Sequence, residues 1–240
     1  DSKFMDHIHL SKRLQAIRAF IEPNERLADI GTDHAFLPID LVQHGIIKFA
    51  VASDIGAGPV AIAKQNVAAA GLTDQISVRQ ADGLAGIHPA DAISTIVIAG
   101  MGGQLITNIL EAGQPQLDGT ETLVLAPNRH QYDVRLWLDK HGYGIIGEQI
   151  IEDEGHIYEM MAAGKTRPDV PYSEADLRFG PILRRQKSPT FMKKMHREAE
   201  KTEAVLEGLA DAKMVPLAKI REQEHLLALI KEELSAHDNR

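Results

Sequence analysis

The sequence predicts an α/β fold: a parallel sheet with helical crossovers, then an antiparallel strand hairpin, then a helical hairpin. Strand-like and helical segments alternate in the order 27–31, 34–44, 49–54, 60–70 and 76–83. This order implies parallel strands joined by right-handed crossovers. Two further apolar runs, at 92–99 and 122–126, extend the predicted parallel sheet to five strands.

The end of the predicted sheet changes character. Two extended, apolar-rich runs at 144–151 and 157–163 are separated by about five residues. A connection this short makes them an antiparallel hairpin. A parallel core finished by such a hairpin departs from the dehydrogenase type of doubly wound sheet. It fits the Rossmann-like S-adenosylmethionine-dependent methyltransferase fold better, and we expect this domain to span residues 1–165.

The remaining residues, 166–240, are expected to form a linker and a helical, coiled-coil-like C-terminal domain. The linker is rich in proline, and helix-rich segments at 190–213 and 216–235 break at Pro216. Two helices joined by a tight turn predict an antiparallel helical hairpin. Glu224 and Lys231 interrupt the apolar seam of the second helix. A dimerising coiled coil is therefore not predicted, and we expect a monomer.

Composition excludes several kinds of chemistry. The 240 residues contain no cysteine, so there is no disulfide, thiolate zinc site or cysteine nucleophile. Eleven histidines are scattered without metal-ligand spacing, and no metal site is expected. No run approaches the roughly 18 apolar residues of a membrane helix, and no start resembles a signal peptide. We therefore expect a cytoplasmic protein without a membrane partner.

The net charge of −8 is unevenly distributed. Residues 178–201 carry eight Lys or Arg side chains and only two acidic ones, whereas the rest of the chain is acidic. Such a stretch is typical either of a local phosphate-binding surface or of a solvated helix face. Its basic residues, called the basic block below, are Arg178, Arg184, Arg185, Lys187, Lys193, Lys194, Arg197 and Lys201.

An acidic residue lies at or near the end of each of the first three predicted strands: Asp29, Asp54 and Asp82. The carboxyl ends of parallel strands share one edge of a sheet, where ligands bind. The loop after the first strand lacks the G-x-G-x-x-G spacing of dinucleotide folds, which argues against a nicotinamide dehydrogenase. An acid at Asp29 suits an ammonium group, and Gly31 lets the backbone pass under a cofactor.

The other two acids suit the nucleoside part of a cofactor. Asp54 lies 23 residues beyond Gly31, the spacing at which an acid reaches a ribose diol. Asp82 could accept from an adenine amino group while Leu84 packs on the ring. Each acid alone is more typical of a cap or loop residue. Their occurrence at three consecutive strand ends favours the cofactor interpretation.

Two motifs follow the fourth and fifth predicted strands. Gly100-Met101-Gly102-Gly103 implies close approach of the backbone to a ligand or to a neighbouring strand. Many base methyltransferases carry an acidic or Asn-Pro-Pro-aromatic motif after the fourth strand, and this chain does not. Pro127-Asn128, after the fifth predicted strand, is the nearest equivalent. Asn128 could bind the edge of a base, or it could be a turn residue.

Taken together, these segments resemble the bacterial TrmK family, whose members methylate N1 of adenine 22 in tRNA. The segments are Leu10-Ser11-Lys12-Arg13-Leu14, Asp29-Ile30-Gly31-Thr32-Asp33-His34-Ala35-Phe36-Leu37-Pro38, Asp54-x-x-x-Gly58-Pro59, Ala99-Gly100-Met101-Gly102-Gly103 and Pro127-Asn128. The resemblance implies S-adenosylmethionine as donor and tRNA as acceptor. Thr32 and Phe36 depart from the Ser and Tyr expected there.

The resemblance also implies roles for individual residues. Asp29, Gly31, Asp33 and His34 would line the methionyl end of the cofactor. Asp54 with Ile55 would hold the ribose, and Asp82 with Gly83 the adenine. Gly100, Met101 and Gly102 would border the methyl-transfer region, with Pro127 and Asn128 opposite. Asp33 or Asn128 is expected to contact the target base, and the basic block is expected to help seat tRNA.

Other functions stay open on the residues alone. The chain could methylate another RNA or a small molecule with the same cofactor. It could also be a non-catalytic tRNA-binding module, although three intact cofactor acids speak against a dead site.

Overall fold

The computed structural model describes residues 8–238, so residues 1–7 and 239–240 of the two predicted domains lie outside the described residues. The chain divides into two compact units, one ending at Tyr172 and the other beginning at Ser173. This division falls within the predicted linker. The predicted domain boundary at 165/166 stays a prediction.

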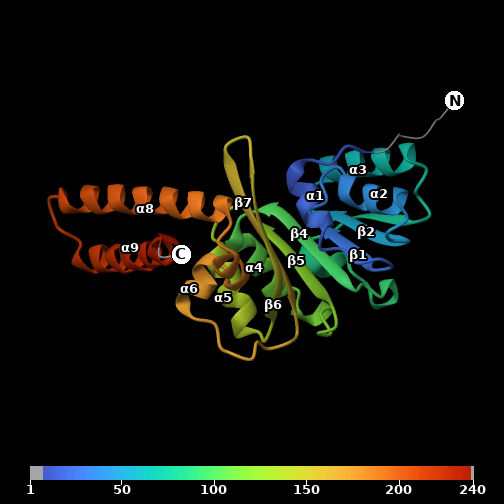
Figure 1. The fold of residues 1–240 in the computed structure, drawn as a ribbon. Helices are drawn as coiled ribbons and strands as arrows, with labels where there is room; N and C mark the ends of the chain where they lie inside the picture. The colour runs from blue at the N-terminus through green and yellow to red at the C-terminus, as the bar shows by residue number, and fades with distance from the viewer. Residues whose placement is uncertain (1–7, 239–240) are drawn as a thin grey trace. The chain divides into compact units, whose positions relative to one another are not determined.

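The first unit is built on a seven-stranded sheet in the order β3-β2-β1-β4-β5-β7-β6 (Figure 1). Neighbouring strands from β1 to β5 pair in parallel, whereas β7 runs antiparallel to both β5 and β6. This confirms the predicted fold class, a Rossmann-like parallel core with a terminal antiparallel hairpin. The strands are β1 (Arg26–Ile30), β2 (Phe49–Asp54), β3 (Ile76–Gln80), β4 (Thr95–Met101), β5 (Thr122–Pro127), β6 (Gly144–Asp153) and β7 (His156–Gly164).

Helices cover both faces of this sheet, which is why the inner strands are apolar along their whole length. One core joins Ile17, Ile39 and Val67 from three helices to Leu27 and Val97 of the strands. Alternate residues of β4 and β5 face the other side, where α4 and α5 contact the sheet and each other. The helices of this unit are α1 (Lys12–Arg18), α2 (Phe36–Gln43), α3 (Ala57–Ala69), α4 (Gly103–Ala112) and α5 (Gln131–Lys140), with 3-10 turns η1 (Gly83–Gly86), η2 (Pro89–Asp91) and η3 (Gln114–Gln116).

The hairpin of β6 and β7 is longer than predicted. Asp153 pairs with His156, so two residues rather than about five connect the strands. Both loop residues, Glu154 and Gly155, have positive φ angles of 49° and 82°. Two left-handed residues match the right-handed twist of the flanking strands. Glu152 and Asp153, which fall in the predicted connection, therefore belong to the end of β6.

The second unit contains four helices within its described residues: α6 (Glu174–Phe179), α7 (Pro181–Gln186), α8 (Pro189–Ala210) and α9 (Leu217–Asp238). The long helices α8 and α9 lie side by side as the predicted antiparallel hairpin (Figure 1). The expectation of a plain linker was wrong over α6 and α7. Ser173 caps α6 through a capping box, and Pro181 lies in the first turn of α7. Each helix has only six residues, too few to show a helical period in the sequence.

Candidate active site

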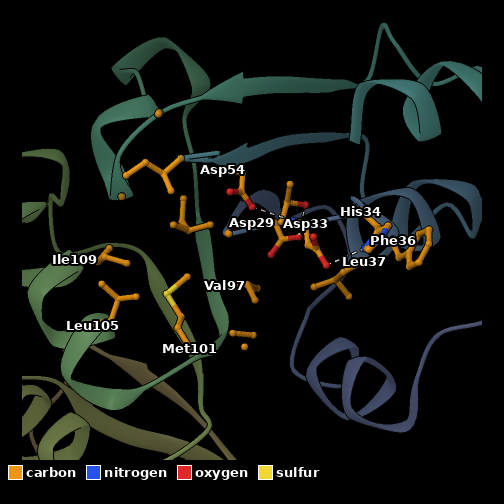
Figure 2. Close-up of a pocket in the computed structure, with 18 of the residues that line it drawn as sticks. Asp29, Asp33, His34, Phe36, Leu37, Asp54, Val97, Met101, Leu105 and Ile109 are labelled. Atoms are coloured by element: carbon orange, nitrogen blue, oxygen red, sulfur yellow. Dashed lines mark hydrogen bonds and ion pairs between the residues drawn. The ribbon is translucent and has the colours of Figure 1, made fainter. Parts of the chain in front are cut away.

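A cavity of about 390 Å³ opens at the carboxyl ends of β1 to β4. Figure 2 shows the acidic side chains of Asp29, Asp33 and Asp54 gathered in it, with Met101, Leu105 and Ile109 across from them. The parallel topology thus brings together acids that are far apart in the sequence. The predicted site residues that line the cavity are Asp29, Gly31, Asp33, His34, Asp54, Ile55, Asp82, Gly83, Gly100 and Met101.

Asp29 is the buried acid of the site. Its side chain accepts a hydrogen bond of 2.7 Å from the Thr32 hydroxyl, a bond that a serine could also donate. Burial raises the pKa of Asp29 to about 7; the Thr32 hydrogen bond opposes the rise, and nearby Asp54 adds to it. A buried carboxylate that lines a cavity and has a raised pKa is typical of a ligand-binding group.

The loop after β1 is held in an unusual backbone conformation. Gly31, Asp33 and Ala35 all have positive φ angles, between 59° and 72°. Asp33 is exposed, and its carboxylate lies 2.8 Å from Nδ1 of His34, whose ring stacks on Phe36. Left-handed non-glycine residues are costly and concentrate at functional sites. The loop therefore presents Asp33 and His34 in a fixed arrangement at the cavity.

Asp54 ends β2, and its carboxylate accepts from two backbone amides. Its Oδ1 accepts from the Gly56 amide at 3.1 Å and its Oδ2 from the Asp33 amide at 3.3 Å. Asp82 precedes η1 and makes no capping bond with its side chain, so the cap interpretation fails there. The expectation that Leu84 packs on an adenine ring was wrong. Leu84 is buried, and its side chain packs so closely on Gly113 that a Cβ added there would lie 2.4 Å from its Cδ1. Ile55, by contrast, is 66% exposed and lines the cavity.

The glycines after the fourth strand have different roles. Gly100 has a φ of +79° and sits where the pairing of β4 with β5 shifts register, as in a bulge. Gly103 begins α4, and a Cβ there would lie 2.3 Å from the His130 carbonyl oxygen. Gly103 thus allows close approach of the loop between β5 and α5, whereas the predicted explanations were a ligand or a neighbouring strand. Gly100 and Met101 line the cavity, but Gly102 does not.

Pro127 and Asn128 lie beside the cavity rather than in its wall. Pro127 ends β5, is buried and pairs with Met101. Asn128 is exposed, and its backbone N–H donates to the Met101 carbonyl at 2.9 Å. Both residues therefore adjoin the end of β4, next to a residue that does line the cavity.

Sequence reasoning missed several residues of the cavity wall. Arg13 and Leu14 come from α1, and Leu105 and Ile109 come from α4. Leu105 is 51% exposed and Ile55 is 66% exposed, so the cavity wall carries exposed apolar side chains from two segments. The helical spacing of Leu105 and Ile109 was a usable signal, whereas nothing local in the sequence places α1 at the cavity.

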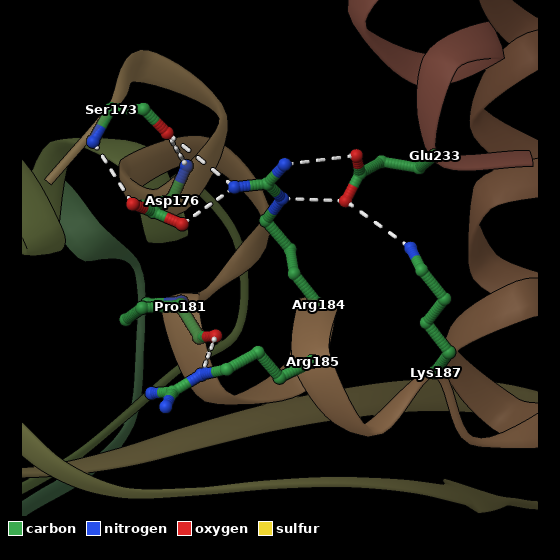
Figure 3. Close-up of polar contacts among 7 residues, drawn as sticks. All are labelled: Ser173, Asp176, Pro181, Arg184, Arg185, Lys187 and Glu233. Carbon is green, nitrogen blue, oxygen red and sulfur yellow. Dashed lines mark hydrogen bonds and ion pairs between the residues drawn. The ribbon is translucent and has the colours of Figure 1, made fainter. Parts of the chain in front are cut away.

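The basic block in the second unit is only partly a charged surface. Arg184 pairs with Asp176 at 2.6 Å and with Glu233 at 2.5 and 3.1 Å, and Lys187 lies 3.7 Å from Glu233 (Figure 3). The hydrogen bond to Glu233 raises the pKa of Arg184 further. These two cations fasten α7 to α9. The predicted tRNA-seating residues that are exposed in this unit are Arg185, Lys193, Arg197 and Lys201, with Lys194 half-exposed.

Residues 8–238 contain no group of three or more His, Cys, Asp or Glu side chains able to hold a metal ion. No helix in the same range is long and apolar enough to cross a membrane.

Fold and site together define an S-adenosylmethionine-dependent methyltransferase of the Rossmann-like class. The family model described as "TrmK: tRNA (adenine(22)-N(1))-methyltransferase" matches residues 27–232. The chain therefore belongs to the TrmK family, as its motifs indicated.

Relatives match over nearly the whole chain. The tRNA (adenine(22)-N(1))-methyltransferase of Bacillus subtilis is 39% identical over 95% of this chain and 98% of its own. The structure of Streptococcus pneumoniae Sp1610 in complex with S-adenosyl-L-methionine has a TM-score of 0.85 and 41% identity, covering 94% of this chain and all of that one. Mycoplasma capricolum TrmK in complex with S-adenosyl-homocysteine has a TM-score of 0.81 and 29% identity, with 94% and 98% covered.

Proposed function

We propose that this protein transfers the methyl group of S-adenosylmethionine to N1 of the adenine at position 22 of tRNA. The observation that carries the proposal is the cavity at the sheet edge, where Asp29, Asp54 and Asp82 meet in a chain of the TrmK family. The relatives named above act on this adenine or were solved with this cofactor or its product.

The residues that line the cavity fit the proposed cofactor. Asp29 is placed to accept from the ammonium of the methionyl end, and Asp54 from the two ribose hydroxyls. Asp82 would accept from the adenine amino group, while Ile55 and Ile109 offer apolar contact to the ring. Gly100 leaves room for the cofactor to pass close to the backbone, since the nearest atom to a Cβ built there is Nη2 of Arg13 at 4.0 Å. Bound S-adenosylmethionine supplies an electrophilic methyl group on its sulfonium.

The chain's own residues have a modest chemical task. N1 of adenine is a neutral nitrogen with an in-plane lone pair, so the enzyme needs no base to activate it. Alignment of the reacting atoms can supply about 7–11 kcal/mol. Met101 borders the place of transfer, and Asp33 or Asn128 contacts the target base. A carboxylate such as Asp33 would also stabilise the positive charge that develops on the methylated adenine.

The second unit is proposed to bind the tRNA. Arg185, Lys193, Lys194, Arg197 and Lys201 are the residues of the basic block for which this role is supported by exposure. Because N1 lies on the Watson–Crick edge, the target adenine must be unpaired or flipped out before transfer. The monomeric state predicted from the impure helical seam is part of this proposal, and sedimentation of the free protein tests it.

Methyl transfer from labelled S-adenosylmethionine to unmodified bulk tRNA, followed by nucleoside digestion, tests the proposal. Label in N1-methyladenosine is the expected result. Label in another nucleoside would point to a different RNA methyltransferase. No label, from protein that binds the cofactor, would point to a small-molecule substrate or a binding module.

A further inference from the structure

We infer that Arg13 of α1 binds the α-carboxylate of S-adenosylmethionine and so fixes the methionyl end opposite Asp29. The inference rests on the proposed cofactor and adds a positioning residue that the motifs of the sheet edge do not include.

Arg13 lies at the cavity and carries a charge that contrasts with its surroundings. It is the one Arg or Lys among the described residues that line the cavity, whereas Asp29, Asp33, Asp54 and Asp82 are all in the wall. A Cβ built on Gly100 would lie 4.0 Å from Nη2 of Arg13. The guanidinium is therefore close to the end of β4, where Gly100 and Met101 border the proposed transfer region.

The other two cations of α1 already have partners within the first unit. Lys12 donates to the Glu152 carbonyl at 2.7 Å, and Arg18 lies 2.9 Å from the buried Asp40. Arg13 has no carboxylate partner in the described part of the chain. Its guanidinium instead lies 5.6 Å from the centre of the Tyr158 ring. A ring face attracts a guanidinium and leaves its in-plane N–H donors available.

The charges of the cavity explain why a cation is needed there. The methionyl end of S-adenosylmethionine carries an ammonium and a carboxylate. The acidic wall suits the ammonium and the sulfonium but repels the carboxylate. A guanidinium matches a carboxylate with two parallel N–H bonds, which fixes orientation as well as charge. Arg13 supplies this complement from an element outside the sheet edge.

Binding of two ligands that differ by the carboxylate tests the inference without requiring catalysis. Titration calorimetry would compare S-adenosylmethionine with decarboxylated S-adenosylmethionine for the wild-type protein, Arg13→Gln, Arg13→Lys and the matched control Lys12→Gln. We expect the wild-type protein and Lys12→Gln to prefer the carboxylate-bearing ligand by about tenfold or more. In Arg13→Gln the preference should fall to about threefold or less, and Arg13→Lys should lie between.

The two ligands keep the inference testable whatever the variant does. A wild-type protein that binds both ligands equally overturns it, even if Arg13→Gln fails to fold. An unchanged preference in a folded Arg13→Gln also overturns it, including the case in which that variant loses affinity for tRNA instead. A wild-type protein that binds neither ligand would contradict the proposed function rather than the role of Arg13.

Discussion

Met101 fills the space that a side chain on Gly31 would need. A Cβ built on Gly31 would lie 2.6 Å from the Cε of Met101, and the φ of Gly31 is +72°. The two residues end neighbouring parts of the sheet edge, one after β1 and one at the end of β4. Glycine at position 31 therefore lets the Met101 side chain pack against the loop that follows β1.

Gly31→Ala is expected to lower both stability and cofactor affinity, because the new methyl group meets Met101 and the backbone is strained. Gly45→Ala is the matched control: its φ is +68°, but nothing lies within 4 Å of the added Cβ. The control should cost about 1 kcal/mol in chemical denaturation and leave cofactor binding intact. Gly31→Ala should cost clearly more, and adding Met101→Ala should restore part of the difference. Equal losses for the two single variants would contradict the contact.

Asp29→Asn is expected to stabilise the cofactor-free protein in a pH-dependent way. With a pKa raised to about 7, folded Asp29 keeps its proton over a range in which the unfolded chain has lost it. The free energy of unfolding therefore falls as pH rises from about 4 to about 7. The variant lacks this loss, so its advantage over the wild type should grow across that window, to about 4 kcal/mol at most. An advantage that stays constant from pH 4 to 8 would contradict the raised pKa.

The same residue predicts how cofactor affinity depends on pH. Binding of the ammonium favours ionised Asp29, so affinity for S-adenosylmethionine should rise with pH up to about 7 and then level off. Asp29→Asn should bind more weakly and show little of this dependence. Calorimetry at pH 5.5, 6.5 and 7.5 gives both measurements, and an identical pH profile for the two proteins would exclude Asp29 as the titrating group.

Asp54→Asn is expected to weaken cofactor binding by about tenfold, because a neutral amide replaces the charged acceptor of two ribose hydroxyls. The amide oxygen of the asparagine can still accept from the Gly56 amide, and only the longer bond of 3.3 Å from the Asp33 amide is lost, so the fold should change little. Asp74→Asn is a suitable control, since Asp74 is exposed in the loop before β3. Unchanged affinity for Asp54→Asn would remove this acid from the proposed cofactor site.

The basic block is expected to separate into stability and binding residues. Glu233→Gln should destabilise the protein by about 1–3 kcal/mol, because it weakens the buried partner of Arg184 and Lys187. Replacing Lys193, Lys194 and Arg197 together by Gln removes three positive charges of the basic block. The triple variant should reduce the salt dependence of tRNA binding by about 0.7–0.9 per lost phosphate contact. An unchanged salt slope in the triple variant would place the tRNA contacts elsewhere.

The sequence predicted the sheet edge well because its signals are local. Asp29, Asp54 and Asp82 each lie at or just after a strand, and parallel topology alone brings them together. The pairing of Arg184 with Glu233 could not be read in the same way, because the two residues are 49 positions apart in a helical unit. Arg13 was missed for a similar reason: its place at the cavity depends on how α1 packs, which no spacing in the chain reveals.

The most direct test of the proposed activity uses two tRNA transcripts that differ only at position 22. Methyl transfer from labelled S-adenosylmethionine would be measured with an adenine at this position and with adenine 22 replaced by guanine. We predict label in N1-methyladenosine for the first transcript and none for the second. Equal labelling of both transcripts, or label at another nucleoside of the first, would contradict the proposed position and chemistry.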